Sequence, residues 1–264
     1  MRFITANVNG IRAAARKGGP AQMLGERPDV IALQEVRADP EQVGVALAGS
    51  GFLDWAAVSS ASQRAGRNGV AVLSRAVIAD TRTGLPGFED EGRWLEAQTS
   101  VADRPLTVVS VYVPKGHAGE PAQDHKMSFL TAMTQRMTEL LGSGGDVIVA
   151  GDINIARTEM DLKNWRQRIG KSGFLPEERA HLDAWERAGW RDLGRDLSGP
   201  GPGPYTWWSQ RGRAFDNDAG WRIDYAWATP DLAARATAAR VLRAASWDAR
   251  WSDHAPVLVD IDPE

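Results

Sequence analysis

The stretch VIVAGDINIA, residues 147–156, joins an apolar run typical of a buried strand to a short polar segment. Gly151 follows the apolar run, and Asp152 and Asn154 come next, two residues apart. Alternate side chains of an extended chain point to the same face, so these two polar groups are expected to converge at the end of a sheet. An Asx turn that closes the strand is the alternative, but it explains one such residue more readily than the pair.

Apolar runs of the same kind recur along the chain and predict β-strands in both halves. They are RFITANV (2–8), DVIALQE (29–35), WAAVSS (55–60), GVAVLS (69–74), LTVVSVYV (106–113), IDYAWAT (223–229), ATAARVL (236–242) and APVLVDI (255–261). Residues 124–141 carry apolar side chains at three- and four-residue spacing, which predicts a helix with Asp124 as its N-cap. Residues 11–25 and 178–188 are weaker helix candidates. This mixture favours two sheets packed face to face with helices outside.

The composition predicts a single domain over residues 1–264. Of the 264 residues, 43% are hydrophobic and 25% are charged, which is enough for a large core. The chain has no cysteine, which excludes disulfides, thiolate zinc sites and cysteine nucleophiles. Because neither a leader-like start nor a run of roughly 18 apolar residues is found, we expect a cytoplasmic protein that does not enter a membrane. A net charge of −3 argues against binding nucleic acid by bulk charge alone.

Two further strand-like runs contain acidic side chains. ALQEV (32–36) leads from an apolar strand into Glu35, which could simply end the strand in solvent. WRIDYAW (221–227) surrounds Asp224 with apolar and aromatic side chains. A carboxylate in such a run needs a partner, because an unpaired buried charge costs several kcal/mol or shifts its pKa.

Near the end of the chain, WSDHAPVLVDI (251–261) places Asp253 and His254 directly before an apolar run. His254 is the partner that we expect for Asp224. An imidazole that donates to a buried carboxylate is held in one tautomer and carries positive charge when a phosphate arrives.

The polar side chains at these strand ends form a set suited to a hard metal ion. They are Asn7, Glu35, Asp152, Asn154, Asp224, Asp253 and His254. Oxygen ligands without sulfur suit Mg²⁺, with Mn²⁺ as the alternative, whereas zinc would want more than one histidine. The remaining histidines, His117, His125 and His181, are expected to be exposed. An acidic site that holds such a cation is suited to phosphate chemistry, because the metal bridges the carboxylates to the anion.

Eight motifs in a fixed order extend this interpretation over essentially the whole chain. They are NVNGIRA (7–13), PDVIALQEV (28–36), NGVAVLS (68–74), VYVP (111–114), GDINIA (151–156), GFLPEER (173–179), WRIDY (221–225) and SDHAPV (252–257). With them, the chain resembles the bacterial exodeoxyribonuclease III family, the class II abasic-site endonucleases of the endonuclease/exonuclease/phosphatase superfamily. The resemblance implies an α/β fold, a four-layer sandwich of two packed mixed sheets flanked by helices.

The resemblance also implies a metal site for Mg²⁺, with Mn²⁺ as the alternative. The residues assigned to it are Glu35, Asn7, Asp253, Asp152 and Asn154. Glu35 would bind the ion directly, while Asn7 and Asp253 would complete its environment, partly through water.

Catalytic roles follow from the same resemblance. Asp152 would orient or deprotonate the attacking water, and Asn154 and Tyr112 would hold phosphate oxygens. His254 would contact the scissile phosphate, with Asp224 behind it fixing its orientation.

An aromatic pocket for a flipped-out sugar without its base is also part of the family pattern. Trp207, Trp221 and Ile223 fall at its positions. Such a pocket is too small for a base and would select abasic sites by shape and by the lower cost of extrusion. Ordinary core packing is the alternative for both tryptophans.

Three basic residues are assigned to DNA binding. The segment 163–175 has four basic residues and no acid, which alone is typical of a solvated surface. The family tracks DNA there, so Arg168 and Lys171 are expected to contact phosphates. Lys115 follows VYVP. In the related eukaryotic enzymes an arginine and a methionine intercalate into the duplex, and this chain has no arginine at the matching place.

Together these inferences predict a Mg²⁺-dependent DNA-repair phosphodiesterase. It would cleave 5′ to abasic sites, degrade DNA in the 3′–5′ direction and trim 3′ phosphates or blocked ends. Its partner would be double-stranded DNA, and a monomer is expected. Two alternatives stay open: a non-catalytic nucleic-acid-binding regulator of the same fold, and a phosphodiesterase acting on lipids or inositol phosphates.

Overall fold

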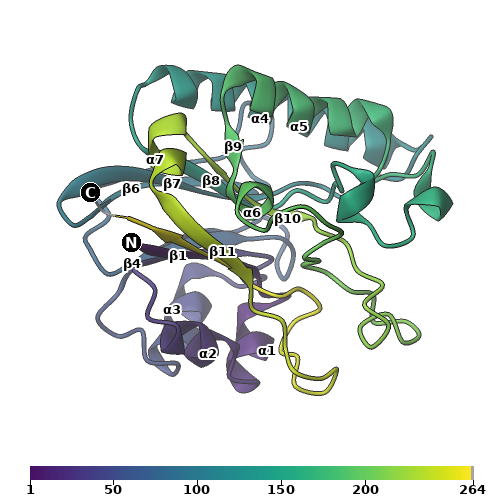
Figure 1. Ribbon diagram of the computed structural model, residues 1–264. Coiled ribbons are helices and arrows are strands. Elements are labelled where there is room, and N and C mark those ends of the chain that lie inside the picture. Colours follow the sequence, from purple (N-terminus) through teal and green to yellow (C-terminus); the bar gives the residue numbers. More distant parts are fainter. Residues whose placement is uncertain (263–264) are drawn as a thin grey trace.

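Two six-stranded sheets form the centre of the molecule in the computed structural model, which describes residues 1–262 (Figure 1). The first, sheet A, has the order β11 (Ala236–Val241), β12 (Val257–Ile261), β1 (Arg2–Asn7), β2 (Val30–Gln34), β4 (Val70–Ser74) and β3 (Ala56–Ser60). The second, sheet B, has the order β5 (Asp80–Thr83), β6 (Trp94–Val101), β7 (Arg104–Tyr112), β8 (Val147–Asp152), β10 (Asp224–Ala228) and β9 (Arg191–Asp192).

Both sheets contain one parallel pair of strands at the centre. In sheet A, β1 runs parallel to β2, and β12 lies antiparallel on the other side of β1. In sheet B, β7 runs parallel to β8, and β10 lies antiparallel on the other side of β8. The two sheets are therefore mixed, as predicted, and they repeat the same local order of strands.

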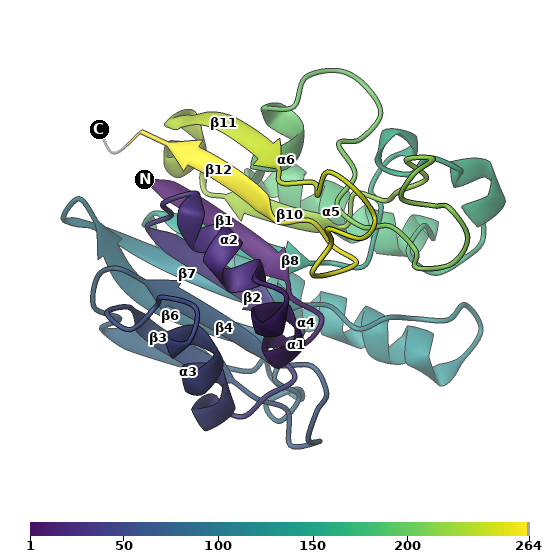
Figure 2. The same ribbon diagram turned by 90° about the horizontal axis from the view of Figure 1, so that it is seen from below.

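Helices cover the outer face of each sheet (Figures 1 and 2). Sheet A is covered by α1 (Ile11–Arg16), α2 (Gly19–Gly25) and α3 (Pro40–Ala48), and sheet B by α4 (Pro121–Gly142) and α5 (Pro176–Ala188). The described residues also form two short 3₁₀ helices and two short α-helices: η1 (Glu159–Asp161), η2 (Trp165–Arg168), α6 (Leu193–Asp196) and α7 (Pro230–Ala234). The layers are helix, sheet, sheet and helix, which confirms the predicted four-layer sandwich.

The central strands are buried on both faces, which explains their unbroken apolar sequences. In β1, Phe3 packs between the sheets and Ile4 packs under the helices of sheet A. In β8, Ile148 packs between the sheets and Val149 packs under α4 and α5. A strand covered on both faces reads as a continuous apolar run, not as an alternation of polar and apolar residues.

The predicted helix boundaries are corrected at two places. Asp124 is not an N-cap: α4 begins at Pro121, with Glu120 in the cap position, because proline is well suited to the first helical turn. The candidate helix 11–25 is divided into α1 and α2 at Gly18, whose φ of 78° lies in the left-handed region.

Two strands, β5 and β6, lack an unbroken apolar run and were not predicted from the sequence. Glu96 lies within β6 and is buried because Arg136 of α4 forms an ion pair with it at 2.8 Å. Glu96, Gln98 and Thr99 interrupt the apolar residues of β6, so this strand lacks the unbroken apolar run of the central strands. Among residues 1–262, no helix is long and apolar enough to cross a membrane.

Candidate active site

The predicted site residues meet at one edge of the two packed sheets. The parallel strands of both sheets end there, with Asn7 closing β1 and Tyr112 and Asp152 closing β7 and β8. The antiparallel neighbours begin there, so Asp224 opens β10 directly opposite Asp152. The carboxyl ends of parallel strands are a common position for ligand sites, since polar side chains can leave the sheet there.

Asn7 joins the carboxylates of the two sheets. Its Nδ2 donates to Glu35 Oε1 at 3.0 Å and to Asp152 Oδ2 at 2.9 Å. Ligand atoms of Glu35, Asp152 and His254 all lie within 4.8 Å of one another, and the three residues are buried. We call these three residues and Asn7 the central cluster. Four segments that are separate in the sequence thus converge on one point.

Glu35 is directed into the central cluster by the backbone after β2. Its φ of 49° lies in the left-handed region, which a glutamate rarely adopts, and its carbonyl accepts from Gly10 N at 2.7 Å. Side-chain cations stand beside it: Arg37 forms an ion pair with Oε2, and Lys115 Nζ lies 3.8 Å from Oε1. Burial opposes ionisation, but Lys115, Asn7 and Arg37 outweigh it and lower the pKa of Glu35 to about 2.

Asp152 serves both the turn and the cluster. Its Oδ1 accepts from the amide of Asn154 at 2.9 Å, which is an Asx turn, while Oδ2 faces Asn7 and His254. The expectation that strand alternation places Asn154 beside Asp152 is therefore wrong. The strand ends at Asp152, and Asn154 has a φ of 53°, so strand alternation does not place its side chain. Its Nδ2 donates instead to the carbonyl of Val113.

The predicted contact between Asp224 and His254 is present. His254 Nδ1 lies 2.9 Å from Asp224 Oδ2, and Nε2 lies 3.7 Å from Asp152 Oδ2. Burial disfavours the imidazolium, but the carboxylates of Asp224 and Asp152 outweigh it and raise the pKa of His254 to about 10. A doubly protonated ring has no lone pair for a metal, so His254 suits contact with a phosphate better than ligation.

Asp253 lies beside the central cluster and has two other partners. Its Oδ1 accepts from Asn9 at 2.8 Å, and its Oδ2 accepts from the indole of Trp207 at 3.1 Å. The side chain of Ser252 donates to the carbonyl of Asn7 at 2.8 Å, which fixes this segment against β1. The expected role of Asp253 near a metal stays a prediction.

Tyr112 is buried on the side of the cluster formed by β7. Its ring lies 4.8 Å from the guanidinium carbon of Arg93. Burial, followed by the negative charges of Glu35 and Asp152, raises the pKa of the phenol. Tyr112 therefore remains a neutral hydrogen-bond donor at physiological pH.

The central cluster fits a hard divalent cation by its donor atoms. Glu35 and Asp152 supply carboxylate oxygens, and the chain has no thiolate to offer. Burial raises the pKa of Asp152 to about 7, and the charge of His254 opposes this shift. The nearby carboxylates of Asp224 and Glu35 raise the pKa further, because they place negative charge close to Asp152. A cation would offset that charge. These residues could therefore hold a metal ion.

A pocket of about 350 Å³ with both indole and basic side chains in its lining adjoins the cluster. Trp207, Trp221 and Ile223, the residues expected to form the aromatic pocket, are among its lining residues, and Lys115 and Arg168 line it as well. The two indoles meet nearly at right angles with their centroids 6.0 Å apart, and the guanidinium carbon of Arg168 lies 5.1 Å from the Trp221 ring. These indoles form a partly exposed wall, so they are not merely core packing.

The loop that follows η2 borders the same pocket. Gly173 has a φ of 89°, and a Cβ there would lie 2.8 Å from the Trp221 ring, so only glycine fits. Lys171 is exposed and donates its amide to the carbonyl of Arg168. Its side chain is outside the group that lines the pocket. Contact of Lys171 with a phosphate stays a prediction.

Lys126 is a buried residue of the site that sequence reasoning missed. Its Nζ donates to the carbonyl of Asn154 at 2.9 Å and lies 2.9 Å from Glu178 Oε1, within the GFLPEER motif. Glu178 also accepts from the amide of Gly173 at 2.6 Å. The spacing of the helix could have indicated its burial, because Lys126 stands four residues before Leu130 and therefore lies on the buried face of α4.

The histidines outside the cluster divide into two groups. His117 and His125 are exposed, as predicted. His181 is half-buried and its Nδ1 lies 3.0 Å from Thr134 Oγ1, so its predicted exposure is wrong. Packing of α5 on α4 covers it.

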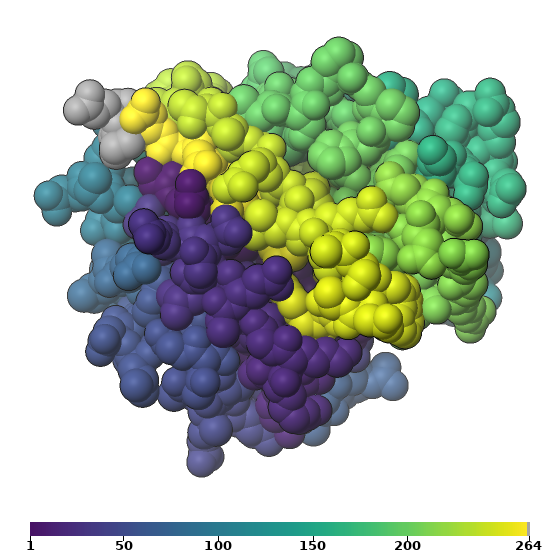
Figure 3. Space-filling model, turned by 60° about the horizontal axis from the view of Figure 1, so that its bottom comes forward, coloured from purple at the N-terminus to yellow at the C-terminus, as the bar shows by residue number. Residues whose placement is uncertain are grey.

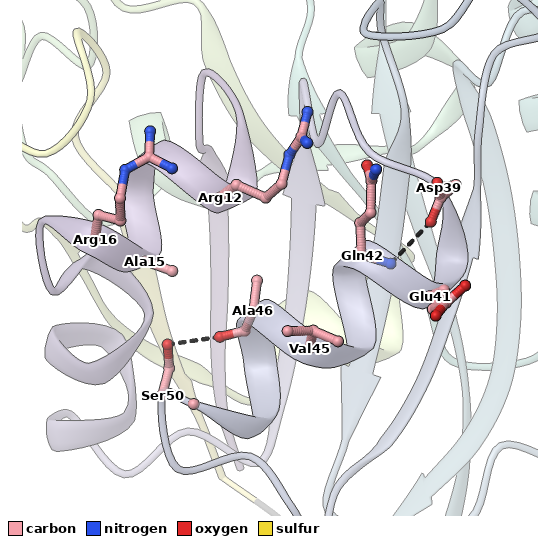
Figure 4. Close-up of a pocket in the computed structure, with 10 residues that line it drawn as sticks. Arg12, Ala15, Arg16, Asp39, Glu41, Gln42, Val45, Ala46 and Ser50 are labelled. Atoms are coloured by element: carbon pink, nitrogen blue, oxygen red, sulfur yellow. Dashed lines mark hydrogen bonds between the residues drawn. The ribbon is translucent and has the colours of Figure 1, made fainter.

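A second pocket, of about 590 Å³, lies away from this chemistry between α1 and α3 (Figure 4). Arg12 and Arg16 project from one helix, while Gln42 and Val45 lie on the other. None of its lining residues belongs to the central cluster. Size alone therefore does not locate the candidate active site.

Comparison with known proteins agrees with the geometry. A model of the Endonuclease/Exonuclease/phosphatase family matches residues 4–254. The chain belongs to this family. The resemblance inferred from the eight motifs is confirmed at the level of the family.

Relatives of this endonuclease/exonuclease/phosphatase chain match it over nearly its whole length. An exodeoxyribonuclease of Bacillus subtilis (strain 168) is 32% identical over 266 residues, covering 99% of this chain and 100% of the relative. Exodeoxyribonuclease III of Haemophilus influenzae is 28% identical, covering 98% and 99%. A solved 3′ phosphatase from Neisseria, bound to a product DNA hairpin, is 29% identical, covers 99% of both chains and has a TM-score of 0.88.

Proposed function

We propose that this chain is a Mg²⁺-dependent DNA-repair phosphodiesterase that cleaves double-stranded DNA 5′ to an abasic site. We also propose 3′–5′ exonuclease activity and removal of 3′ phosphates or blocked ends. One observation carries the proposal: the central cluster opens beside a pocket walled by Trp207 and Trp221. The names of the relatives, exodeoxyribonuclease and 3′ phosphatase, support the same chemistry.

Glu35, with Asp152, Asn7, Asn154 and Asp253 around it, would hold the metal ion. When bound, Mg²⁺ would polarise the phosphate and offset the charge of the carboxylates. The ion pairs of Glu35 with Arg37 and Lys115 would be exchanged for that ion. Both basic side chains are partly exposed and have room to turn away.

Asp152 is proposed to accept the proton of the attacking water. The water oxygen forms a bond to phosphorus while the bond between phosphorus and the 3′ oxygen of the preceding nucleotide breaks. The departing 3′ oxygen takes a proton from solvent water, so the products are a 3′ hydroxyl and a 5′ phosphate on the abasic sugar. His254 and Tyr112 would donate to phosphate oxygens, where negative charge grows in the transition state.

Asp224 is proposed to orient His254, to which it lies at 2.9 Å. Asn154 would hold a further phosphate oxygen from the turn after β8. A buried carboxylate behind an imidazole fixes the ring and favours its charged form. This arrangement would keep a positive donor aimed at the phosphate.

The indole-walled pocket is proposed to receive the extruded abasic sugar. Trp207, Trp221 and Ile223 present an apolar surface, and Arg168 and Lys115 stand at its border. An unpaired sugar costs less to extrude than a paired nucleotide, which would favour the lesion. Lys171 would add a phosphate contact nearby. We further propose that residues 1–264 act as one domain and as a monomer.

Asp152→Asn tests the proposed base. We expect incision of an abasic duplex to fall by about 10² to 10⁴, the range typical of general acid–base catalysis, with little change in the melting temperature. Asp231→Asn, an exposed acid on α7, is the matched control. Cleavage by Asp152→Asn at the parent rate would contradict the assignment.

Four substrates separate this function from its alternatives. A labelled abasic duplex, a 3′-phosphate duplex, a plain recessed duplex and a lipid phosphodiester are each incubated with EDTA and then with excess Mg²⁺. We expect the DNA substrates to be hydrolysed only when Mg²⁺ is restored. Binding of DNA without hydrolysis would favour a regulator, and hydrolysis of the lipid alone would favour the lipid enzyme.

A further inference from the structure

A third pocket, of about 220 Å³, lies on the other side of Asp253 from the indole-walled pocket. It is formed by α1, by the loop that precedes Trp221, and by the β11–β12 loop (residues 242–256). Figure 3 looks onto this face, where the purple N-terminal helices meet the yellow β11–β12 loop with a hollow between them. Its lining residues include Asn9, Lys17, Gln210, Trp247, Arg250 and Asp253.

Trp247 gives this pocket an exposed aromatic surface. It is 48% exposed, although large aromatic side chains are usually covered in folded proteins. The guanidinium carbon of Arg250 lies 5.3 Å from the Trp247 ring and 4.7 Å from the ring of buried Phe215. Arg250 therefore anchors the exposed indole to the core and restricts its movement.

The loop that carries Trp247 is fixed on the helices of sheet A. The indole nitrogen of Trp251 donates to Gln22 of α2 at 2.8 Å, and its ring packs on Gly19. A Cβ at Gly19 would lie 2.5 Å from that ring, so the close approach requires glycine. The pocket is thus formed before any ligand arrives, which lowers the entropy cost of binding.

The pocket borders the central cluster at Asn7, whose Oδ1 accepts from the amide of Asn9 at 3.0 Å and whose carbonyl accepts from Ser252 of the pocket lining. Asn9 lines the pocket, and its Nδ2 donates to Asp253 Oδ1 at 2.8 Å. The other oxygen of Asp253 accepts from Trp207, which lines the proposed pocket for the abasic sugar. DNA that places a phosphate at the cluster would therefore pass next to Trp247.

We propose that this third pocket is a stacking subsite for one unpaired nucleobase of the DNA substrate. The proposal rests on the proposed function of the central cluster. The face of Trp247 would stack on the base, and the side-chain amides of Asn9 and Gln210 would meet its polar edge. Lys17 would face the adjoining phosphate. Bases within a duplex are covered by their neighbours, so the occupant is a base in an overhang or a frayed end.

Binding to hairpins with and without an overhang tests this subsite. Dissociation constants are measured in EDTA by fluorescence anisotropy, so that hydrolysis does not interfere. The probes are a blunt DNA hairpin and the same hairpin with three unpaired nucleotides on either its 5′ or its 3′ end. We expect Trp247→Ala to weaken binding of one overhang hairpin by roughly 5- to 100-fold, the range for loss of base–aromatic stacking, and to leave the blunt hairpin unchanged.

Two further variants make the result specific. Trp247→Phe keeps an aromatic face and should retain most of the preference for the overhang. Leu53→Ala removes another exposed apolar side chain, 77% exposed and outside both pockets, and should bind every hairpin like the parent. The subsite is refuted if Trp247→Ala binds both overhang hairpins as tightly as the parent, or weakens the blunt hairpin equally. Failure of the proposed function would appear differently, as absence of cleavage by the parent in Mg²⁺.

Discussion

At the scale of single residues, Asp152 resolves a choice that the sequence left open. One of its oxygens forms the Asx turn with Asn154, and the other faces Asn7 and His254. The turn and the site are therefore two uses of one carboxylate. The position at a strand end could be predicted from VIVAGD, but the partners could not, because Asn7 lies 145 residues away.

Asp224→Asn tests the positioning of His254. The variant keeps the size of the side chain but removes the charge that favours the imidazolium. We expect kcat for abasic-site incision to fall about 10- to 100-fold, as for other partners that orient a functional histidine, while KM changes less. Steady-state kinetics with Asp231→Asn as control provide the measurement. A kcat within twofold of the parent would mean that Asp224 does not orient His254 for catalysis.

At the scale of elements, a buried polar network holds the wall of the indole-lined pocket. Arg222, between Trp221 and Ile223, donates to Asp161 at 2.6 Å and to Asp192 at 2.8 Å. Asp161 also accepts from the amide of Thr158 at 2.9 Å, which caps η1. The motif WRIDY could be recognised in the sequence. The partners of its arginine could not be predicted, because Asp161 and Asp192 lie on other elements.

Asp161→Asn tests this network. We expect the free energy of unfolding at pH 7 to fall by about 3–5 kcal/mol, because the change leaves a buried guanidinium short of a counter-charge. Burial raises the pKa of Asp161, but Arg222 and Arg195 outweigh it and lower that pKa to about 2. A lowered folded pKa gives stability that is complete above the ordinary value of 3.8 and is lost as pH falls through about 2.

Urea unfolding between pH 5 and pH 2 measures both effects. The parent should lose stability more steeply than Asp161→Asn as the pH falls from about 4 to 2. Asp196→Asn is the matched control, because that acid is exposed and its ion pair with Arg191 should contribute at most about 1 kcal/mol. Equal stability of Asp161→Asn and the parent at pH 7 would contradict the role of the network.

At the scale of the whole molecule, the site joins the two halves of the sandwich. Glu35 follows β2 of sheet A, and Asp152 ends β8 of sheet B. Both sheets place the carboxyl ends of a parallel pair and the start of an antiparallel neighbour at this edge. A metal ion held there would link the sheets in the folded state only.

Glu35→Gln tests the metal site without an assay of activity. A ligand that binds only the folded state stabilises it, by about 2.7 kcal/mol at one hundred times its dissociation constant. We expect Mg²⁺ to raise the melting temperature of the parent and to have little effect on Glu35→Gln. Calorimetric scans at constant ionic strength, with K⁺ as the control cation, provide the measurement. An equal rise in both proteins would place the ion elsewhere.

The sequence by itself determined the layers of this fold and the types of residue in the site. Unbroken apolar runs required strands buried on both faces, and polar residues placed after or before those runs had to lie at the ends of the sheets. The tertiary structure alone decided which groups face one another: Asn7 between Glu35 and Asp152, Lys126 against Glu178, and Trp247 beside the cluster. The physical reason is range, since burial patterns are local along the chain, whereas hydrogen bonds and ion pairs depend on how distant segments pack.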